Sequence, residues 1–209
     1  MRVVIFGANG RVGRLVVRRA LEQGLGVVAF VHSASSLAQN SKLTVVQGDI
    51  YRPDEVAAAI RQADAVISAL GSWGTPRKDV LGAGMQAIIP AMQEHGLSRI
   101  VSLTGADARA PGDTLGIVHR LSHPLLGLVA GKVLADGEQH IRLLQASGLA
   151  WTVVRSPVMN EQGDAGRFVL SRRRPMPWQT IHRQSVATSM VELVQSQAEL
   201  RAAPFIARN

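Results

Sequence analysis

Three glycines at three-residue spacing follow an apolar run at the start of the chain. Val3–Phe6 leads into Gly7, Gly10 and Gly13, and apolar residues at helical spacing follow. Glycine at these positions permits a tight turn, a close approach of backbone to ligand, and close helix packing. N–H groups and the dipole at the helix start would bind a pyrophosphate. The predicted phosphate-binding residues are Gly7, Asn9, Gly10, Arg11, Val12 and Gly13.

The segment after the second apolar run indicates which dinucleotide would bind. An acidic residue there would bind the ribose hydroxyls of NAD, but residues 31–36 read Val-His-Ser-Ala-Ser-Ser. His32, the Ser33 hydroxyl and nearby Arg11 could instead bind a 2′-phosphate, which an acid would repel. The sequence therefore favours NADP(H) over NAD(H). The alternatives are a ligand-free turn, and ordinary polar roles for His32 and Ser33.

Short apolar runs alternate with amphipathic ones along the whole chain. We expect strands at Arg2–Phe6, Val27–Val31, Leu43–Gln47, Ala65–Leu70, Arg99–Leu103, Trp151–Val154 and Pro204–Ala207. We expect helices at Gly13–Gln23, Asp54–Gln62, Gly84–His95, Gly137–Ser147 and Ser185–Gln195. Strands separated by helices imply right-handed crossovers. The fold class is therefore α/β, a Rossmann-type doubly wound parallel sheet in a single three-layer domain over residues 1–209.

The region Ala108–Lys132 does not fit this alternation. Pro111, Gly112 and Pro124 interrupt the pattern, so this region forms either a mobile lid over a site or a static surface excursion. Leu121–Leu134 is apolar but contains His, Pro and Lys, and we expect a helix packed on the domain there.

Composition limits the classes of function. The chain has no cysteine, which excludes disulfides, thiolate zinc sites and a cysteine nucleophile, and fits a cytoplasmic location. No His, Asp or Glu grouping has metal-ligand spacing, and we expect no membrane partner. The formal net charge of +8 suits a solvated basic face or an anionic partner. Arg172–Arg174 could contact phosphates or an anionic substrate, but no recognition motif favours nucleic acid.

Several motifs in a fixed order resemble the atypical short-chain dehydrogenase/reductases that bind NAD(P), near the NmrA-like and biliverdin reductase B (flavin reductase) members. The matching segments are residues 7–13, 46–50, 66–71, 99–106, 147–155 and 181–187. The resemblance implies an adenine pocket at Asp49 and Ile50. It also implies that the turn Ala69, Leu70 and Gly71 faces the cofactor.

The same resemblance implies a nicotinamide site at the ends of the fifth and sixth strands. Thr104 and Pro157 would lie beside the nicotinamide, and Thr104 is the one candidate catalytic residue; ending the strand through a local backbone bond is its alternative role. The substrate region would come mainly from residues 105–135 and 156–185. The sixth-strand signature runs Arg155-Ser156-Pro157 where the family has Arg-Pro-Gly.

The family's Tyr-x-x-x-Lys pair is missing. The only tyrosine is Tyr51, and residue 55 is Glu. Reduction of a flavin, quinone or extended tetrapyrrole can take its proton from water, so we expect a reductase of a planar small molecule, acting as a monomer or homodimer. A non-catalytic NADP(H) sensor that signals through a partner protein is the alternative.

Other residues could assist such chemistry. Trp73 could stack on a flat substrate or simply pack against the surface. Any of His119, His123 and His140 could donate a proton, but such histidines are more often surface or packing residues. Asp136 could be an acid catalyst or a helix N-cap.

Overall fold

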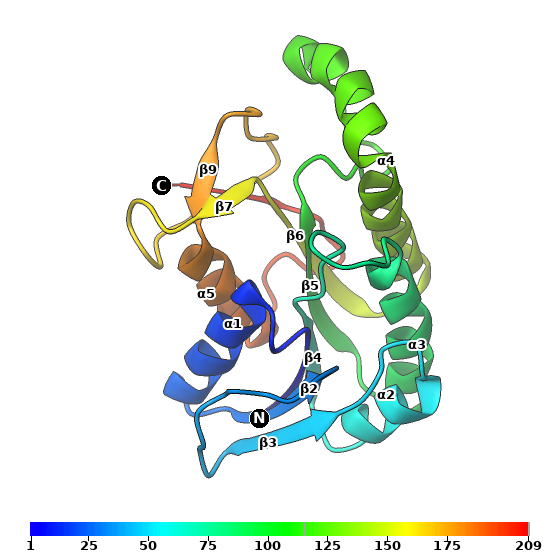
Figure 1. Ribbon diagram of the computed structural model, residues 1–209, viewed down its shortest axis with the longest axis vertical. Coiled ribbons are helices and arrows are strands. Elements are labelled where there is room, and N and C mark those ends of the chain that lie inside the picture. The colour runs from blue at the N-terminus through cyan, green and yellow to red at the C-terminus, as the bar shows by residue number, and fades with distance from the viewer. Residues whose placement is uncertain (115, 209) are drawn as a thin grey trace.

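A mostly parallel sheet of eight strands forms the centre of the computed structural model, which describes residues 1–114 and 116–208, with the backbone alone for 117–126 (Figure 1). The strand order is β3-β2-β1-β4-β5-β6-β10-β8, and only the β8–β10 pair is antiparallel among the pairs described. The strands are β1 (Arg2–Phe6), β2 (Gly26–Val31), β3 (Leu43–Gln47), β4 (Ala65–Ser68), β5 (Arg99–Gly105), β6 (Ala150–Ser156), β8 (Val169–Ser171) and β10 (Phe205–Ala207). This order confirms the predicted doubly wound Rossmann-type fold.

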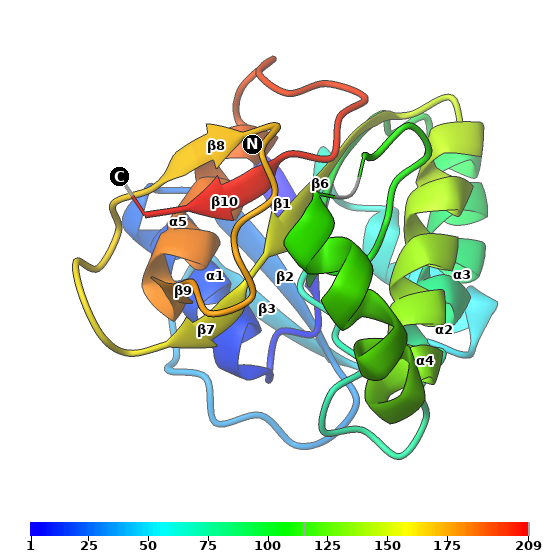
Figure 2. The same ribbon diagram turned by 90° about the horizontal axis from the view of Figure 1, so that it is seen from above.

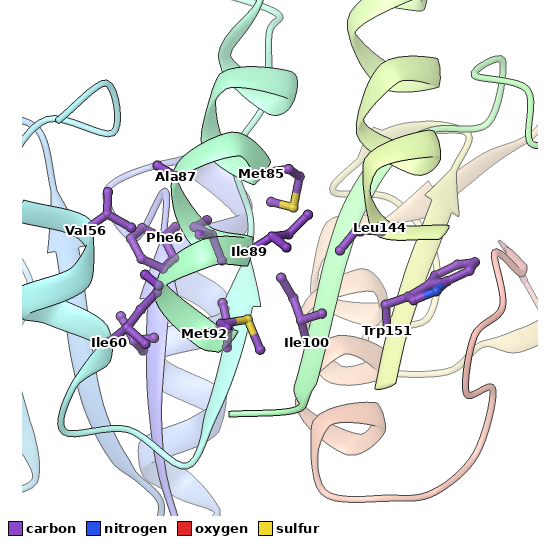
Figure 3. Packing of buried hydrophobic residues seen from close by; sticks show 14 of the residues in the cluster. Phe6, Val56, Ile60, Met85, Ala87, Ile89, Met92, Ile100, Leu144 and Trp151 are labelled. Atoms are coloured by element: carbon purple, nitrogen blue, oxygen red, sulfur yellow. The ribbon is translucent and has the colours of Figure 1, made fainter. Parts of the chain in front are cut away.

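Helices cover both faces of the sheet (Figure 2). One face carries α1 (Arg11–Glu22) and α5 (Arg183–Val194); the other carries α2 (Pro53–Ile60), α3 (Val80–Glu94) and α4 (Ile117–Ala146). Alternate residues of each strand enter separate apolar clusters on the two faces. Figure 3 shows the α2–α4 side, where Met85 and Met92 of α3 lie over Ile100 of β5. The three predicted layers are therefore present.

The order β3-β2-β1-β4 contains the point at which winding reverses direction. The chain runs from β1 outward to β3 and returns to the other side of β1, where Val3 pairs with Ala65 of β4. The carboxyl ends of two parallel strands diverge at such a point, and ligands of open α/β sheets bind in the crevice that results. The glycine-rich turn directly follows β1 and therefore lies at this crevice.

Several short elements differ from the predictions. The structure adds β7 (Val158–Asn160) and β9 (Thr180–His182), which form a separate small sheet, and the antiparallel edge strand β8. Each of the three has only three residues, too few to show a period of two. Strands β5 and β6 also extend two residues beyond the predicted ends, so they reach further toward the crevice.

Helix α4 joins the helices predicted at Leu121–Leu134 and Gly137–Ser147 into one element and bends at Ala130, whose φ and ψ are −130° and 20°. Its first part projects beyond the rest of the molecule (Figure 1). Leu128 and Val129 are 85% and 80% exposed, so the expectation of a helix packed on the domain is wrong at these positions. The lid hypothesis for residues 108–132 stays a prediction. Among the described residues, no helix is both long and apolar enough to cross a membrane.

Candidate functional site

The β1–α1 turn has the geometry that its glycines predict. Gly7 has a φ of +75°, a left-handed conformation that favours glycine. A Cβ at Gly7 would lie 2.7 Å from the carbonyl oxygen of Ala69, and a Cβ at Gly13 would collide with the carbonyl oxygen of Gly7. Both glycines therefore let α1 and the end of β4 approach the turn closely.

Unpaired amide groups lie at the mouth of α1. Gly10 is the N-cap residue, with extended backbone and no side chain to bond the helix start. The N–H groups of Arg11, Val12 and Gly13 donate to no other part of the chain that the structure describes. A Cβ on Gly10 would meet only the Gly7 carbonyl oxygen, at 3.1 Å, so the space above the turn is open. Free donors beneath open space fit a pyrophosphate group.

Asn9 joins this turn to the loop after β2. Its side-chain amide donates to the carbonyl oxygen of Ser33 at 3.2 Å, and the Ser35 hydroxyl donates to its oxygen at 2.8 Å. The side chains of His32 and Ser33 are exposed beside the turn. The structure therefore brings the predicted phosphate-binding turn and the predicted 2′-phosphate residues together, with Asn9 holding the two segments.

Arg183 adds positive charge to the same corner, and the sequence reasoning missed it. It lies at the start of α5, donates to the carbonyl oxygen of Met159 at 3.2 Å, and forms an ion pair with Glu161. Burial lowers the pKa of Arg183, and the charge of Arg11 lowers it further. Arg11 is exposed at the first position of α1, and Arg183 is the first residue of α5, the helix that packs against α1. No local pattern links residues that are so far apart along the chain.

The predicted adenine-pocket residues follow the end of β3, and the predicted cofactor-facing turn follows the end of β4. The Asp49 carboxylate accepts a hydrogen bond from the Tyr51 amide at 3.0 Å. Ile50 is buried and, like Leu70, contacts Gly84 of α3. Because Ile50 is buried, it supports the wall of the predicted adenine pocket largely from within the core. Ala69 and Leu70 are partly buried and Gly71 is exposed, directly beside the turn.

Thr104 and Pro157 lie near the carboxyl ends of β5 and β6. Thr104 pairs in register with Arg155, and Pro157 is partly buried between β6 and β7. The Thr104 hydroxyl faces α4 and is covered there, because a Cβ on Gly137 would lie only 2.7 Å from its oxygen. The catalytic role of Thr104 and the cofactor contact of Pro157 stay predictions.

Asp136 caps a helix other than its own. It is buried in the middle of α4 and accepts hydrogen bonds from the amides of Leu81 at 3.0 Å and Gly82 at 2.7 Å, in the first turn of α3. It also accepts one from the Ser72 hydroxyl. This arrangement supports the capping alternative over the acid-catalyst alternative, although the capped helix is α3. Asp136 thereby holds the loop after β4, which carries the exposed Trp73.

His140 is not placed to donate a proton to a substrate. It is fully buried between α4 and β5, where its Nε2 lies 2.8 Å from the Ser102 hydroxyl. Burial lowers its pKa to about 4, because the charged imidazolium loses its hydration. His140 is therefore neutral near pH 7, and its suggested proton-donor role is wrong. His119 and His123 fall among the side chains outside the described residues.

The buried His140 makes the protein sensitive to acid. Its folded-state pKa of about 4 lies below the ordinary 6.5, so only the unfolded chain takes up this proton between those values. We expect the wild type to lose about 2 kcal/mol of unfolding free energy between pH 7 and pH 5 from this group. His140→Gln, which can still bond Ser102, should lose less over that range in urea unfolding. His32→Gln, at an exposed position, is the control, and equal losses in His140→Gln and wild type would contradict the account.

Comparison with known proteins places this geometry in a family. A family model described as NAD(P)H-binding matches residues 7–197. Photosystem II assembly factor Ycf39 from Synechocystis sp. is 34% identical over 106 residues, 48% of this chain and 32% of that protein. A 2-alkyl-3-oxoalkanoate reductase from Stenotrophomonas maltophilia is 29% identical over 140 residues, 64% of this chain and 39% of that protein. The chain thus spans less than half the length of either relative.

Solved structures share the whole fold. ChuY, an anaerobillin reductase from Escherichia coli O157:H7, superposes with a TM-score of 0.80 at 22% identity and covers 100% of this chain and 97% of its own. A short-chain dehydrogenase/reductase from Veillonella parvula in complex with NADP has a TM-score of 0.78 at 15% identity, with 99% and 94% covered. The family match includes the glycine-rich turn, the switch point and the late helix α5, so the chain belongs to the NAD(P)H-binding family.

Proposed function

We propose that this chain is an NADPH-dependent reductase that passes two electrons to a planar acceptor such as a flavin or quinone. The observation that carries the proposal is the set of free amides at the mouth of α1, beneath the open space above Gly10. Such a site binds a dinucleotide through its pyrophosphate. When bound, NADPH supplies the hydride, and the acceptor takes it together with a proton.

The charges around the turn support NADP(H) as the dinucleotide. Arg11 adds positive charge beside α1, Arg183 lies there in its ion pair with Glu161, and the loop that carries His32 and Ser33 has no acidic side chain. A 2′-phosphate gains hydrogen bonds and favourable charge interactions in such surroundings. In NADH the free hydroxyl would find no carboxylate partner on this loop.

Replacing Ser33 by aspartate should reverse this preference. The new carboxylate would repel a 2′-phosphate and accept a hydrogen bond from the free hydroxyl of NADH. We expect the ratio of the NADPH and NADH dissociation constants to rise at least about tenfold in Ser33→Asp, measured by calorimetry. Ser36→Asp adds the same charge three residues along the loop and should change the ratio less. An unchanged ratio in Ser33→Asp would contradict the assignment of this loop.

Neither Tyr51 nor His140 is placed to donate a proton to a substrate, which favours an acceptor that takes its proton from water. Tyr51 is the only tyrosine, and its hydroxyl donates to Asp79 at 2.9 Å. Burial, with the hydrogen bond to Asp79, raises the pKa of Tyr51 to about 12. His140 is buried and neutral. Carbonyl reduction needs a proton donor at the developing alkoxide, whereas reduced flavins and quinones exchange protons readily with water.

Trp73 is the residue we assign to acceptor binding. Its ring is exposed on the loop that directly follows Gly71, and Ser72 next to it is held by Asp136. A flat ring system gains from stacking on an exposed aromatic side chain. This placement supports an aromatic acceptor over an aliphatic one.

Steady-state oxidation of NADPH with FMN, riboflavin and quinones tests the proposal. We expect turnover with at least one acceptor and a raised KM in Trp73→Ala. Trp178→Ala removes an equally exposed ring from the loop before β9 and is the matched control. Absence of turnover with every acceptor, in protein that binds NADPH, would overturn the reductase assignment.

A dinucleotide-dependent regulatory role is the second candidate. One relative that matches about half of this chain carries the name of an assembly factor rather than an enzyme. The missing tyrosine–lysine pair suits such a role as well. Tight NADP(H) binding without turnover, with a partner protein recovered in one redox state only, would favour it. Equal partner recovery in all cofactor states would exclude it.

A further inference from the structure

A second pocket lies away from the glycine-rich turn. It has a volume of about 530 Å³ and lies between the loop after β5, the end of α4, and strands β6 and β10. Its lining includes Arg155, Arg172, Arg174 and Arg201, with Asp113 as the one acidic residue. None of the residues predicted to bind the cofactor lines it. Its size is within the range of small-molecule sites.

The two inner arginines are buried, and together they share one carboxylate. The side chains of Arg155 and Arg174 are 4% and 7% exposed, and both form ion pairs with the same Oδ2 atom of Asp113. Asp113 is the one carboxylate in ion-pair contact with these two guanidinium groups, and Asp107 acts on Arg174 without an ion pair, so positive charge is in excess at contact range in a place that water reaches poorly. Burying an unpaired charge is costly, so a buried excess of one sign indicates a missing counter-ion.

The pKa directions agree with this imbalance. Burial would raise the pKa of Asp113, but the hydrogen bonds from Arg155 and the Ala110 amide, and the charges of both arginines, outweigh it and lower the net pKa. Burial lowers the pKa of Arg174, and the charge of Arg155 adds to that effect, whereas the charges of Asp113 and Asp107 oppose it. Asp113 is therefore ionised near neutral pH, and Arg155 and Arg174 repel each other.

The hydrogen bonds of these arginines fix their orientation and still leave donors. Arg155 donates from Nε to the Ala203 carbonyl at 2.8 Å, and from Nη1 to Asp113. Arg174 donates from Nη1 to the Ala106 carbonyl and from Nη2 to Asp113. Among the described residues, Arg155 Nη2 and Arg174 Nε have no hydrogen-bond partner. A planar guanidinium held in this way is suited to an oxyanion.

The outer part of the pocket adds charge and an apolar wall. Arg172 is 68% exposed and pairs with Glu199 at 2.7 Å, and Arg201 is exposed and donates to the Gly148 carbonyl. Trp151 and Phe205 line the pocket as well, and Arg155 stacks on the Phe205 ring at 3.7 Å. A ligand would therefore meet positive charge at both depths and apolar surface between them.

We propose that this pocket is a binding site for a small organic molecule that bears a carboxylate or phosphate group. The oxyanion replaces the missing counter-ion beside Arg155 and Arg174, and the apolar part of the ligand lies against Trp151. The site is separate from the dinucleotide site, and the inference does not depend on the proposed reductase activity.

Fluorescence of Trp151 provides a direct test. The chain has three tryptophans, and the exposed Trp73 and Trp178 can be replaced by phenylalanine so that only Trp151 reports. Pyrophosphate, phenyl phosphate, citrate and benzoate are titrated into this protein, with and without saturating NADPH. We expect a saturable change with at least one probe in the presence of NADPH, which occupies the other oxyanion-binding site. The phosphate and carboxylate probes distinguish the two sources of the oxyanion.

Matched variants distinguish a specific binding site from non-specific electrostatic attraction to a basic protein. Arg172→Gln should weaken binding of the responding probe about tenfold, because one charge-assisted contact is lost. Arg167→Gln removes an equally exposed arginine, paired with Asp164, from outside the pocket and should not change it. No saturable signal at millimolar concentrations of any probe, or equal weakening in the two variants, would overturn the proposal. Protein that failed to bind NADPH but still gave the Trp151 signal would contradict only the proposed dinucleotide function.

Discussion

Gly10→Asp should bind NADPH at least about 100-fold more weakly than wild type, while its unfolding free energy stays equal or rises. The backbone of Gly10 is extended (φ −68°, ψ 165°), so an aspartate fits there after a small shift of the Gly7 carbonyl. Its carboxylate would accept hydrogen bonds from the free amides of α1 and contribute about 0.3 kcal/mol as an N-cap relative to glycine. The same carboxylate would repel a pyrophosphate by about 3 kcal/mol or more, which lowers affinity by more than two orders of magnitude.

Gly10→Asp is informative because it should weaken NADPH binding without lowering stability. Gly10→Asn adds a side chain of the same size that also caps the helix, but it carries no charge. We therefore expect an intermediate affinity for Gly10→Asn and a similar gain in stability. Calorimetric titration with NADPH and thermal unfolding without it measure both quantities. Undiminished NADPH affinity in Gly10→Asp would show that the dinucleotide binds elsewhere.

Asp136→Ala should lower the unfolding free energy by about 3 kcal/mol. The carboxylate is buried and accepts hydrogen bonds from Leu81, Gly82 and the Ser72 hydroxyl, so its removal leaves buried donors without partners. The first turn of α3 and the loop after β4 would lose their shared anchor. Because that loop borders the cofactor site, we also expect weaker NADPH binding.

Glu138→Ala is the control for this prediction. Glu138 lies two residues along α4 and pairs at the surface with Arg109 and Arg142, at 3.1 and 3.8 Å. Surface ion pairs contribute about 1 kcal/mol or less, so this variant should be nearly as stable as wild type. Denaturant unfolding of the two variants measures the difference. Equal, small losses in both would contradict the capping role of Asp136.

The phosphate corner could be predicted from the sequence because its signal is local. Gly7, Gly10 and Gly13 lie within seven residues of one another, and each performs a steric task that the spacing alone implies. The strand order follows from the alternation of strands and helices, since right-handed crossovers restrict the topology. Both the phosphate corner and the strand order can therefore be predicted from short-range sequence patterns and general rules of packing.

The rest of the site depends on contacts between distant segments. Asp136 is 54 residues from Gly82, and Arg155 is 42 residues from Asp113, so neither contact can be predicted from a local sequence pattern. Pro124 and the nearby glycines hide the continuity of α4, because such residues ordinarily mark loops, so the sequence predicts two helices where the structure has one. The structure supports the packing role of His140, which its residue type alone does not establish. Its type indicates titration near neutrality, but only its burial against Ser102 shows that it stays neutral.

Calorimetric titration of the wild-type protein with NADPH, NADP+, NADH and NAD+ tests the central claim most directly. The account predicts one saturable site, tighter for the two phosphorylated coenzymes, because free amides at the mouth of α1 and the charges of Arg11 and Arg183 meet the phosphate groups there. Absence of heat with all four coenzymes, confirmed by an unchanged thermal midpoint in their presence, would contradict it.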